Sequence, residues 1–169
     1  MKRILITGMS GTGKSTVIEA LTAQGYKAVD ADCDEFSHWV AVDAETSAAG
    51  SPVEADRDWV WRTDRIQTLL ATEDADVLFV SGCAPNMGQF LPQFDHVILL
   101  SAPADLVVER LASRTNNAYG KDPDQVARVL SLIESVEPLL RRVADMEIDT
   151  SLPLDEVVAR VIKIGLAGG

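Results

Sequence analysis

Short apolar segments alternate with amphipathic segments along the whole chain. Runs rich in aliphatic and β-branched residues predict five strands, at residues 2–7, 26–30, 77–81, 96–100 and 146–149. Apolar residues at helical spacing predict helices at 15–23, 36–42, 54–72, 87–94 and 104–113, a helix from Pro123 that is kinked near Pro138, and a last helix at 154–164. In the 54–72 segment this spacing joins Trp59 to Ile66, Leu69 and Leu70. Strands that alternate with helices predict an α/β fold.

Two segments between the strands have the composition of regions that close over a ligand. Residues 36–72 include a run of small and polar residues at 43–52, which predicts a surface loop within a substrate flap. Arg110 and Arg114 share one helix face and lead into a polar insert that ends at Lys121. This pattern predicts a lid at about residues 114–122 that closes on phosphates.

Composition limits the kinds of partner. The 169 residues are 47% hydrophobic, which suits one compact domain over 1–169, as a monomer or homodimer. The net charge of -11 disfavours nucleic acid and anionic membranes, so we expect a small-molecule substrate. Two cysteines, Cys33 and Cys83, without a signal peptide or long apolar span, favour the cytoplasm. We expect both thiols to be half-buried packing groups, since their spacing suits neither a disulfide nor a metal site.

The motif with the most specific chemistry is the segment from Gly8 to Ser15, which matches G-x-x-x-x-G-K-[ST] at every fixed position. A predicted strand precedes it and a predicted helix follows, as a phosphate-binding loop requires. The residues expected to bind nucleotide phosphates are Gly8, Ser10, Gly11, Thr12, Gly13, Lys14, Ser15 and Thr16. The alternative is a glycine turn that happens to contain Lys-Ser.

Carboxylates follow the second predicted strand. Asp30 and Asp32 lie at its carboxyl end, where an open α/β sheet gathers its ligands, and their alternate spacing lets both point the same way. Asp30, together with the Ser15 hydroxyl, suits a magnesium site, and Asp32 suits a hydroxyl of a substrate. The alternative is a solvated acidic turn in which Asp34 caps the next helix.

Two further groups are candidates for substrate binding. Arg57, Arg62 and Arg65 suit an anionic acceptor such as a carboxylate, although a charged helix face balanced by nearby acidic residues explains them equally well. Gly82 at the exit of the third strand allows a ligand to approach the backbone, which places Gly82, Cys83 and Asn86 near the site. The alternative for this segment is an ordinary turn before a helix.

The chain resembles the small P-loop kinases of the adenylate kinase, shikimate kinase and gluconate kinase-like superfamily over its whole length. Asp30-Ala31-Asp32 is similar to the Asp-x-Asp of shikimate kinases, and Ser81-Gly82-Cys83 to their Ser/Thr-Gly-Gly segment. Glu109-Arg110-Leu111 followed by Arg114 resembles the lid entry of the group, and 148–157 resembles its adenine-side segment, which includes Pro153.

The resemblance implies a three-layer fold with a five-stranded parallel sheet in the order 2-3-1-4-5 and helices on both faces. It implies that ATP binds at the phosphate loop, that Ser15 and Asp30 hold Mg²⁺, and that Asp32 orients or deprotonates an acceptor hydroxyl. Lys14, Arg110 and Arg114, with Lys121, would then stabilise the transferring phosphoryl group.

Departures from the family patterns bear on the acceptor. The segment after the third strand lacks the Asp-Gly-Phe-Pro-Arg of nucleoside monophosphate kinases, and Gly82-Cys83-Ala84 stands where shikimate kinases have three glycines. We therefore expect a kinase that phosphorylates a hydroxyl of a small polar metabolite. The alternatives are a nucleoside monophosphate kinase and a nucleotide-binding regulatory module that hydrolyses ATP slowly or not at all.

Overall fold

The fold is built on one five-stranded parallel sheet. A computed structural model describes residues 1–41, 57–115 and 120–167. The sheet has the strand order β2-β5-β1-β6-β7 and consists of β2 (Lys27–Asp30), β5 (Val77–Ser81), β1 (Lys2–Thr7), β6 (His96–Ser101) and β7 (Met146–Asp149). All of its pairings are parallel. Counted along the chain, this is the predicted order 2-3-1-4-5, and the prediction of an α/β fold is confirmed.

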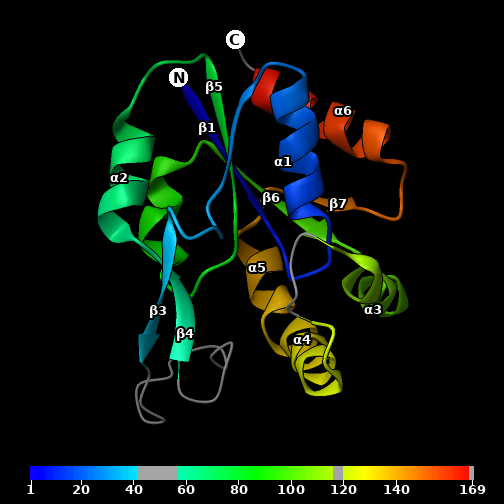
Figure 1. Ribbon diagram of the computed structural model, residues 1–169. Helices are drawn as coiled ribbons and strands as arrows, with labels where there is room; N and C mark the ends of the chain where they lie inside the picture. Colours follow the sequence, from blue (N-terminus) through cyan, green and yellow to red (C-terminus); the bar gives the residue numbers. More distant parts are fainter. Residues whose placement is uncertain (42–56, 116–119, 168–169) are drawn as a thin grey trace.

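Alternating residues of the central strands pack against helices on opposite faces of the sheet. On β1, Ile4 and Ile6 face the helices α1 (Lys14–Ala23) and α6 (Leu154–Leu166), whereas Leu5 faces the other side. That other side is covered by α2 (Thr63–Ala71), the 3₁₀ helix η1 (Met87–Gln93) and α5 (Glu137–Val143). Figure 1 shows helices on both faces of the sheet, and the central strand β5 is accordingly buried at every position.

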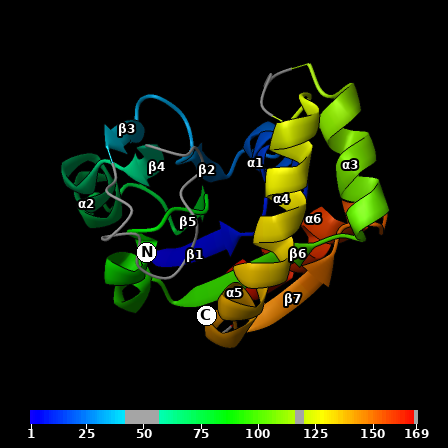
Figure 2. The same cartoon turned by 90° about the horizontal axis from the view of Figure 1, so that it is seen from below.

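Two further helices extend beyond the carboxyl ends of the strands. Helix α3 (Ala104–Ser113) packs on α4 (Pro123–Ser135) through Val107, Leu111 and Val129 (Figure 2). The Asp122 side chain caps α4 by accepting a hydrogen bond of 2.8 Å from the backbone N–H of Asp124. Pro138 lies in the first turn of α5, where its missing N–H costs no helical hydrogen bond, so the predicted interruption near this residue is confirmed.

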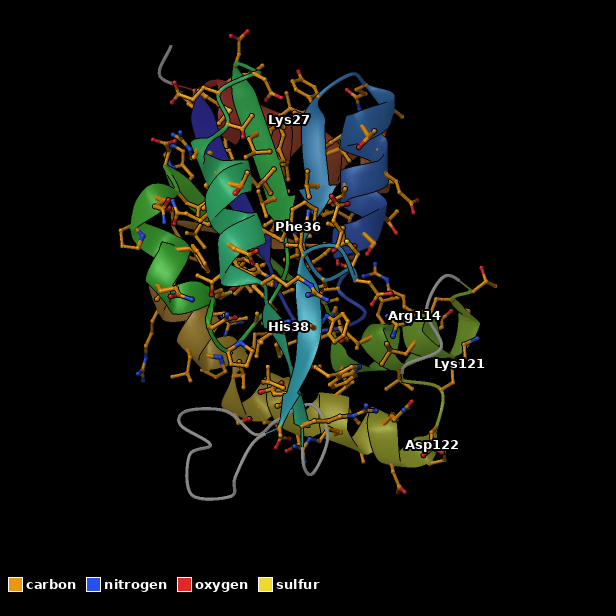
Figure 3. The ribbon with its side chains drawn as sticks, turned by 60° about the vertical axis from the view of Figure 1, so that its left-hand side comes forward. Lys27, Phe36, His38, Arg114, Lys121 and Asp122 are labelled. Atoms are coloured by element: carbon orange, nitrogen blue, oxygen red, sulfur yellow. The ribbon has the colours of Figure 1, made fainter. Side chains whose placement is uncertain are left out.

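The structure corrects two predicted helices. Residues 36–42 and the start of 54–72 contain the two strands of an antiparallel hairpin, β3 (Ser37–Ala41) and β4 (Arg57–Trp61) (Figure 3). Aromatic and β-branched residues favour strands here, and Trp39 pairs across the hairpin with Trp59, with 5.1 Å between their ring centroids. Helix α2 begins after β4, at Thr63. The predicted loop at 43–52 lies outside the described residues.

Candidate active site

Glycines give the phosphate loop its close packing. Gly8 has φ 153°, and a Cβ there would lie 2.4 Å from the carbonyl oxygen of Leu100. Gly11 has φ 81°, and its Cβ would lie 3.0 Å from the Val107 side chain of α3. The loop therefore cannot accept side chains at these positions without moving β6 or α3. It ends at the N-terminus of α1, where unpaired backbone N–H groups favour anions.

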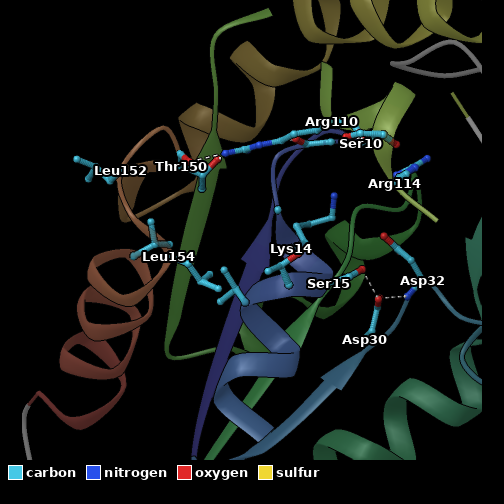
Figure 4. A pocket seen from close by; sticks show the side chains of 16 residues that line it. Ser10, Lys14, Ser15, Asp30, Asp32, Arg110, Arg114, Thr150, Leu152 and Leu154 are labelled. Carbon is cyan, nitrogen blue, oxygen red and sulfur yellow. Dashed lines mark hydrogen bonds between the residues drawn. The ribbon is translucent and has the colours of Figure 1, made fainter. Parts of the chain in front are cut away.

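Lys14 opens α1 and folds back over the loop. Its Nζ donates hydrogen bonds to the carbonyl oxygens of Gly8, at 2.7 Å, and Met9, at 3.0 Å. The ammonium group is thereby held above the loop, where a bound phosphate chain would meet it (Figure 4).

Ser15 and the two predicted carboxylates meet at the carboxyl end of β2. The Ser15 hydroxyl donates to Asp30 Oδ2 at 2.8 Å, and the Asp32 backbone N–H donates to Asp30 Oδ1 at 3.0 Å (Figure 4). A hydroxyl and a carboxylate beside a phosphate loop are oxygen donors of the kind Mg²⁺ prefers when phosphates and water complete its shell. Ser15 and Asp30 therefore fit the predicted magnesium site.

The Asp32 carboxylate is held by donors from β4 and from the segment after β5. Oδ1 lies 3.4 Å from Trp61 Nε1, and the Cys83 backbone N–H lies 3.3 Å from both carboxylate oxygens. The pKa of Asp32 is raised to about 6, mainly because burial removes solvent from the carboxylate; the charge of Lys14 opposes this shift, and the charge of Asp30 adds to it. A carboxylate with such a pKa can be ionised and still accept a proton near neutral pH.

A polar cavity of about 420 Å³ lies over the phosphate loop, and we call it the phosphate-loop cavity (Figure 4). Its lining includes the loop, Asp30, Asp32, Arg110 and Arg114. Arg110 donates to the carbonyl oxygen of Thr150 at 2.5 Å and to its hydroxyl at 2.8 Å. The same hydroxyl donates to the carbonyl oxygen of Thr12 at 2.7 Å. Thr150 thus links α3 to the loop, a role that sequence reasoning missed although it had marked 148–157 as adenine-side.

A second cavity of about 290 Å³ lies on the other side of Lys14 and Asp32, and we call it the apolar cavity. Its walls come from the loop, from the segment after β5, and from α4 and α5. Most of the described side chains in this lining are apolar: Met9, Ala84, Pro85, Met87, Leu91, Val129, Leu132, Val136, Leu139, Leu140 and Val143. Ser10, Lys14 and Asp32 line both cavities. Sequence reasoning missed this α4 and α5 wall, because an apolar helix face in a sequence does not show whether it lines a cavity.

Comparison with protein families matches residues 4–131 to the family described as AAA domain. The chain belongs to the AAA domain family. Over an alignment 173 positions long, the chain is 28% identical to a shikimate kinase of Halorhodospira halophila, and the alignment covers 98% of this chain and 94% of the relative.

Solved structures resemble this AAA domain chain in fold. A shikimate kinase from Acinetobacter baumannii in complex with shikimate has a TM-score of 0.62 at 18% identity, covering 97% of this chain and 92% of the other. A gluconokinase from Sinorhizobium meliloti 1021 has a TM-score of 0.59 at 20% identity, covering 97% and 93%. The predicted place among small P-loop kinases of the shikimate and gluconate kinase-like group is confirmed.

Several predicted site residues of the AAA domain chain lie away from both cavity linings. Arg57 stacks on the Trp39 ring at 4.1 Å, and Arg62 Nε donates to the carbonyl oxygens of Asp34 and Ser37. The Asn86 side chain pairs with both backbone groups of Trp61, at 3.0 and 2.8 Å. The Arg57 contact lies within the hairpin, and the Arg62 and Asn86 contacts join the hairpin to the rest of the domain. None of them supports direct substrate contact, which stays a prediction.

The remaining predictions have mixed outcomes. Pro153 precedes the first residue of α6, and the neighbouring Leu152 and Leu154 line the phosphate-loop cavity. Lys121 is exposed and lines neither cavity, and residues 116–119 of the predicted lid lie outside the described residues (Figure 3).

The two cysteines differ in exposure. Cys83 is half-buried as predicted, and burial raises its pKa to about 11. Cys33 is exposed, because the acidic turn around it lies on the surface.

Gly82 allows the close approach of Asp32 to β5. A Cβ there would lie 2.8 Å from Asp32 Oδ1 and 2.8 Å from Trp61 Cζ2. Gly82→Ala should therefore displace the carboxylate and lower the free energy of unfolding by about 1–3 kcal/mol. Urea denaturation checks this, with Gly88→Ala as the matched control, because a Cβ at Gly88 meets no described atom within 4 Å. Equal unfolding free energies of the two variants would contradict this account of Gly82.

Proposed function

We propose that this protein transfers the γ-phosphoryl group of ATP to a hydroxyl of a small molecule. The observation that carries the proposal is the position of Lys14 and Asp32 in the wall shared by the two cavities. The phosphate loop lines one cavity, and the other cavity has room for an acceptor. ATP and the acceptor would therefore meet at these two side chains. The relatives named shikimate kinase and gluconokinase support the same reaction class.

In this mechanism the acceptor oxygen bonds to the γ-phosphorus while the bond from that phosphorus to the β,γ-bridging oxygen breaks, and ADP leaves. Asp32 accepts the proton of the hydroxyl. Lys14 and the backbone N–H groups of the loop stabilise the negative charge on the transferring group. Mg²⁺, when held by Ser15 and Asp30, would neutralise charge on the phosphates. Arg110 and Arg114, at the opposite wall, are suited to the same phosphates.

The proposal also covers the class of acceptor and the cellular compartment of the reaction. The net charge of -11 argues against nucleic acid as the acceptor, and we place the reaction in the cytoplasm, where ATP is available. No helix within the described ranges is long and apolar enough to cross a membrane.

The test is a transfer screen with ATP labelled in its γ-phosphate, Mg²⁺ and pooled small metabolites, with nucleoside monophosphates assayed separately. We expect label in a phosphorylated metabolite. Efficient transfer to nucleoside monophosphates alone would favour the nucleotide kinase alternative. Label released only as inorganic phosphate would favour an ATPase module.

A further inference from the structure

Two tryptophans of the hairpin reach Asp32. Trp59 and Trp61 are two residues apart on β4, so their side chains lie on the same face of the strand. Trp59 Nε1 donates a hydrogen bond of 3.2 Å to the backbone carbonyl oxygen of Asp32, and Trp61 Nε1 donates one of 3.4 Å to Oδ1 of its carboxylate. One indole therefore holds the main chain of Asp32, and the other holds its side chain.

Trp61 is itself fixed by several neighbours. Its side chain is 1% exposed, and its ring packs on Phe90 with 5.9 Å between the ring centroids. The Asn86 side chain bonds both of its backbone groups. A Cβ at Gly82 would lie 3.0 Å from Trp61 Nε1, so the N–H edge of the indole lies directly against the exit of β5. A donor held in this way can fix the position of the carboxylate that it contacts.

The donors are divided unevenly between the two oxygens of the Asp32 carboxylate. Among the described residues, Oδ1 accepts from Trp61 and from the Cys83 backbone N–H, whereas Oδ2 accepts from Cys83 alone. Oδ2 therefore has more capacity left for the hydrogen bond of a hydroxyl. Because Asp32 lies in the wall shared by the two cavities, the orientation of its carboxylate decides whether that hydroxyl points at the phosphoryl group.

We propose that Trp61 and Trp59 are positioning residues that fix the Asp32 carboxylate with Oδ1 toward the hairpin and Oδ2 toward the acceptor hydroxyl. This inference rests on the proposed function and assigns β4 a part in it. Neither tryptophan lines a cavity, so both act through Asp32 and not by contact with the reactants. Asn86, which the sequence places near the substrate, then acts one step further away, as the group that holds Trp61.

The indole N–H signals test the contact in the protein without ligands. The three tryptophans give three such signals in a ¹H–¹⁵N correlation spectrum, and Trp→Phe variants assign them. Asp32→Asn replaces a charged acceptor by a neutral one, so the Trp61 proton signal should move upfield. The Trp59 signal should move less, because its carbonyl acceptor remains. Trp39, whose ring contacts are with Trp59 and Arg57, is the internal reference. An unchanged Trp61 signal, or equal shifts of all three signals, would overturn the proposal.

Rates test the positioning role. With γ-labelled ATP and the metabolite pool of the transfer screen, Trp61→Phe should lower the rate at saturating ATP about tenfold, while the KM for ATP stays within about twofold. Trp59→Phe, at a half-buried position, provides a second variant that loses less packing and should lower the rate several-fold. Trp39→Phe is the matched control, because Trp39 is 40% exposed on the same hairpin, and it should leave the rate unchanged.

A double substitution separates positioning from packing. In the Asp32→Asn background, Trp61→Phe should change the residual rate by less than about twofold, because the carboxylate that Trp61 positions is already lost. An equal fold loss in both backgrounds would assign Trp61 to packing and overturn the inference.

The two proposals fail in different ways. If the unmodified protein transfers no label to any metabolite, the proposed function is wrong, and the indole signals still decide whether Trp61 holds the Asp32 carboxylate. Label transfer at the full rate by both Trp61→Phe and Trp59→Phe would overturn the positioning role alone.

Discussion

Replacing Lys14 with alanine is expected to reduce phosphoryl transfer by about 10³-fold, because the variant loses a charged donor aimed at the transferring group. The fold should survive, since Lys14 lies at the cavity surface and its Nζ contacts loop carbonyl oxygens. Initial rates at saturating ATP and a circular dichroism spectrum measure the two effects separately.

The matched control for this prediction is Lys163→Ala. Lys163 is an exposed lysine in the last turn of α6 and lines neither cavity. Its removal makes the same change in net charge and should leave the rate within about twofold of the unmodified protein. A Lys14→Ala variant as active as this control would contradict the assignment of the loop to catalysis.

Replacing Asp32 with asparagine is expected to lower the maximal rate by about 10²–10⁴-fold, because the amide cannot accept the proton of the hydroxyl. ATP affinity should change little, since the loop donors and Lys14 remain. The maximal rate of the unmodified protein should rise with pH around 6, as Asp32 ionises, and this rise should be absent from the residual rate of the variant.

The same substitution is expected to raise stability above pH 6. The pKa of Asp32 is raised to about 6 in the folded protein from 3.8, so the folded state binds the proton more tightly than the unfolded state does. The free-energy cost of keeping the Asp32 carboxylate ionised in the folded protein is absent below pH 4 and complete above pH 6. Asp32→Asn removes it and should gain about 1–3 kcal/mol of unfolding free energy at pH 8 relative to pH 4.

Asp34→Asn controls for both Asp32 effects. Asp34 lies in the same acidic run, is exposed, and lines neither cavity. It should leave the rate, its pH dependence and the stability unchanged. A rate unaffected by Asp32→Asn would remove the proposed base, whatever the stability result.

The parts of the site that depend on local sequence could be predicted. The loop at 8–15 is contiguous and its glycines, Lys14 and Ser15 have fixed roles, so its geometry follows from the motif. Asp30 ends a strand and Asp32 follows it. The neighbours of that strand in the sheet are set by right-handed crossover rules, so the meeting of these carboxylates with Ser15 could also be expected.

The parts of the fold and the site that depend on tertiary packing could not be predicted from the sequence. Trp59 falls at helical spacing with Ile66, and only its pairing with Trp39 from a distant segment decides for a strand. Once β4 is a strand, Asp58 lines the apolar cavity and Arg57 stacks on Trp39, a placement that the helical spacing did not predict. The Val129, Leu132 and Val136 wall reads as core in the sequence, because an apolar helix face does not reveal whether protein or a cavity covers it.

The most direct test of the central claim is the fate of the γ-phosphorus of ATP, followed by ³¹P nuclear magnetic resonance in one sample of protein, Mg²⁺, ATP and a pool of small hydroxylated metabolites. The account predicts a growing phosphomonoester signal together with ADP, which is absent with Asp32→Asn. ATP converted only to ADP and inorganic phosphate, at equal rates in the two proteins, would contradict it.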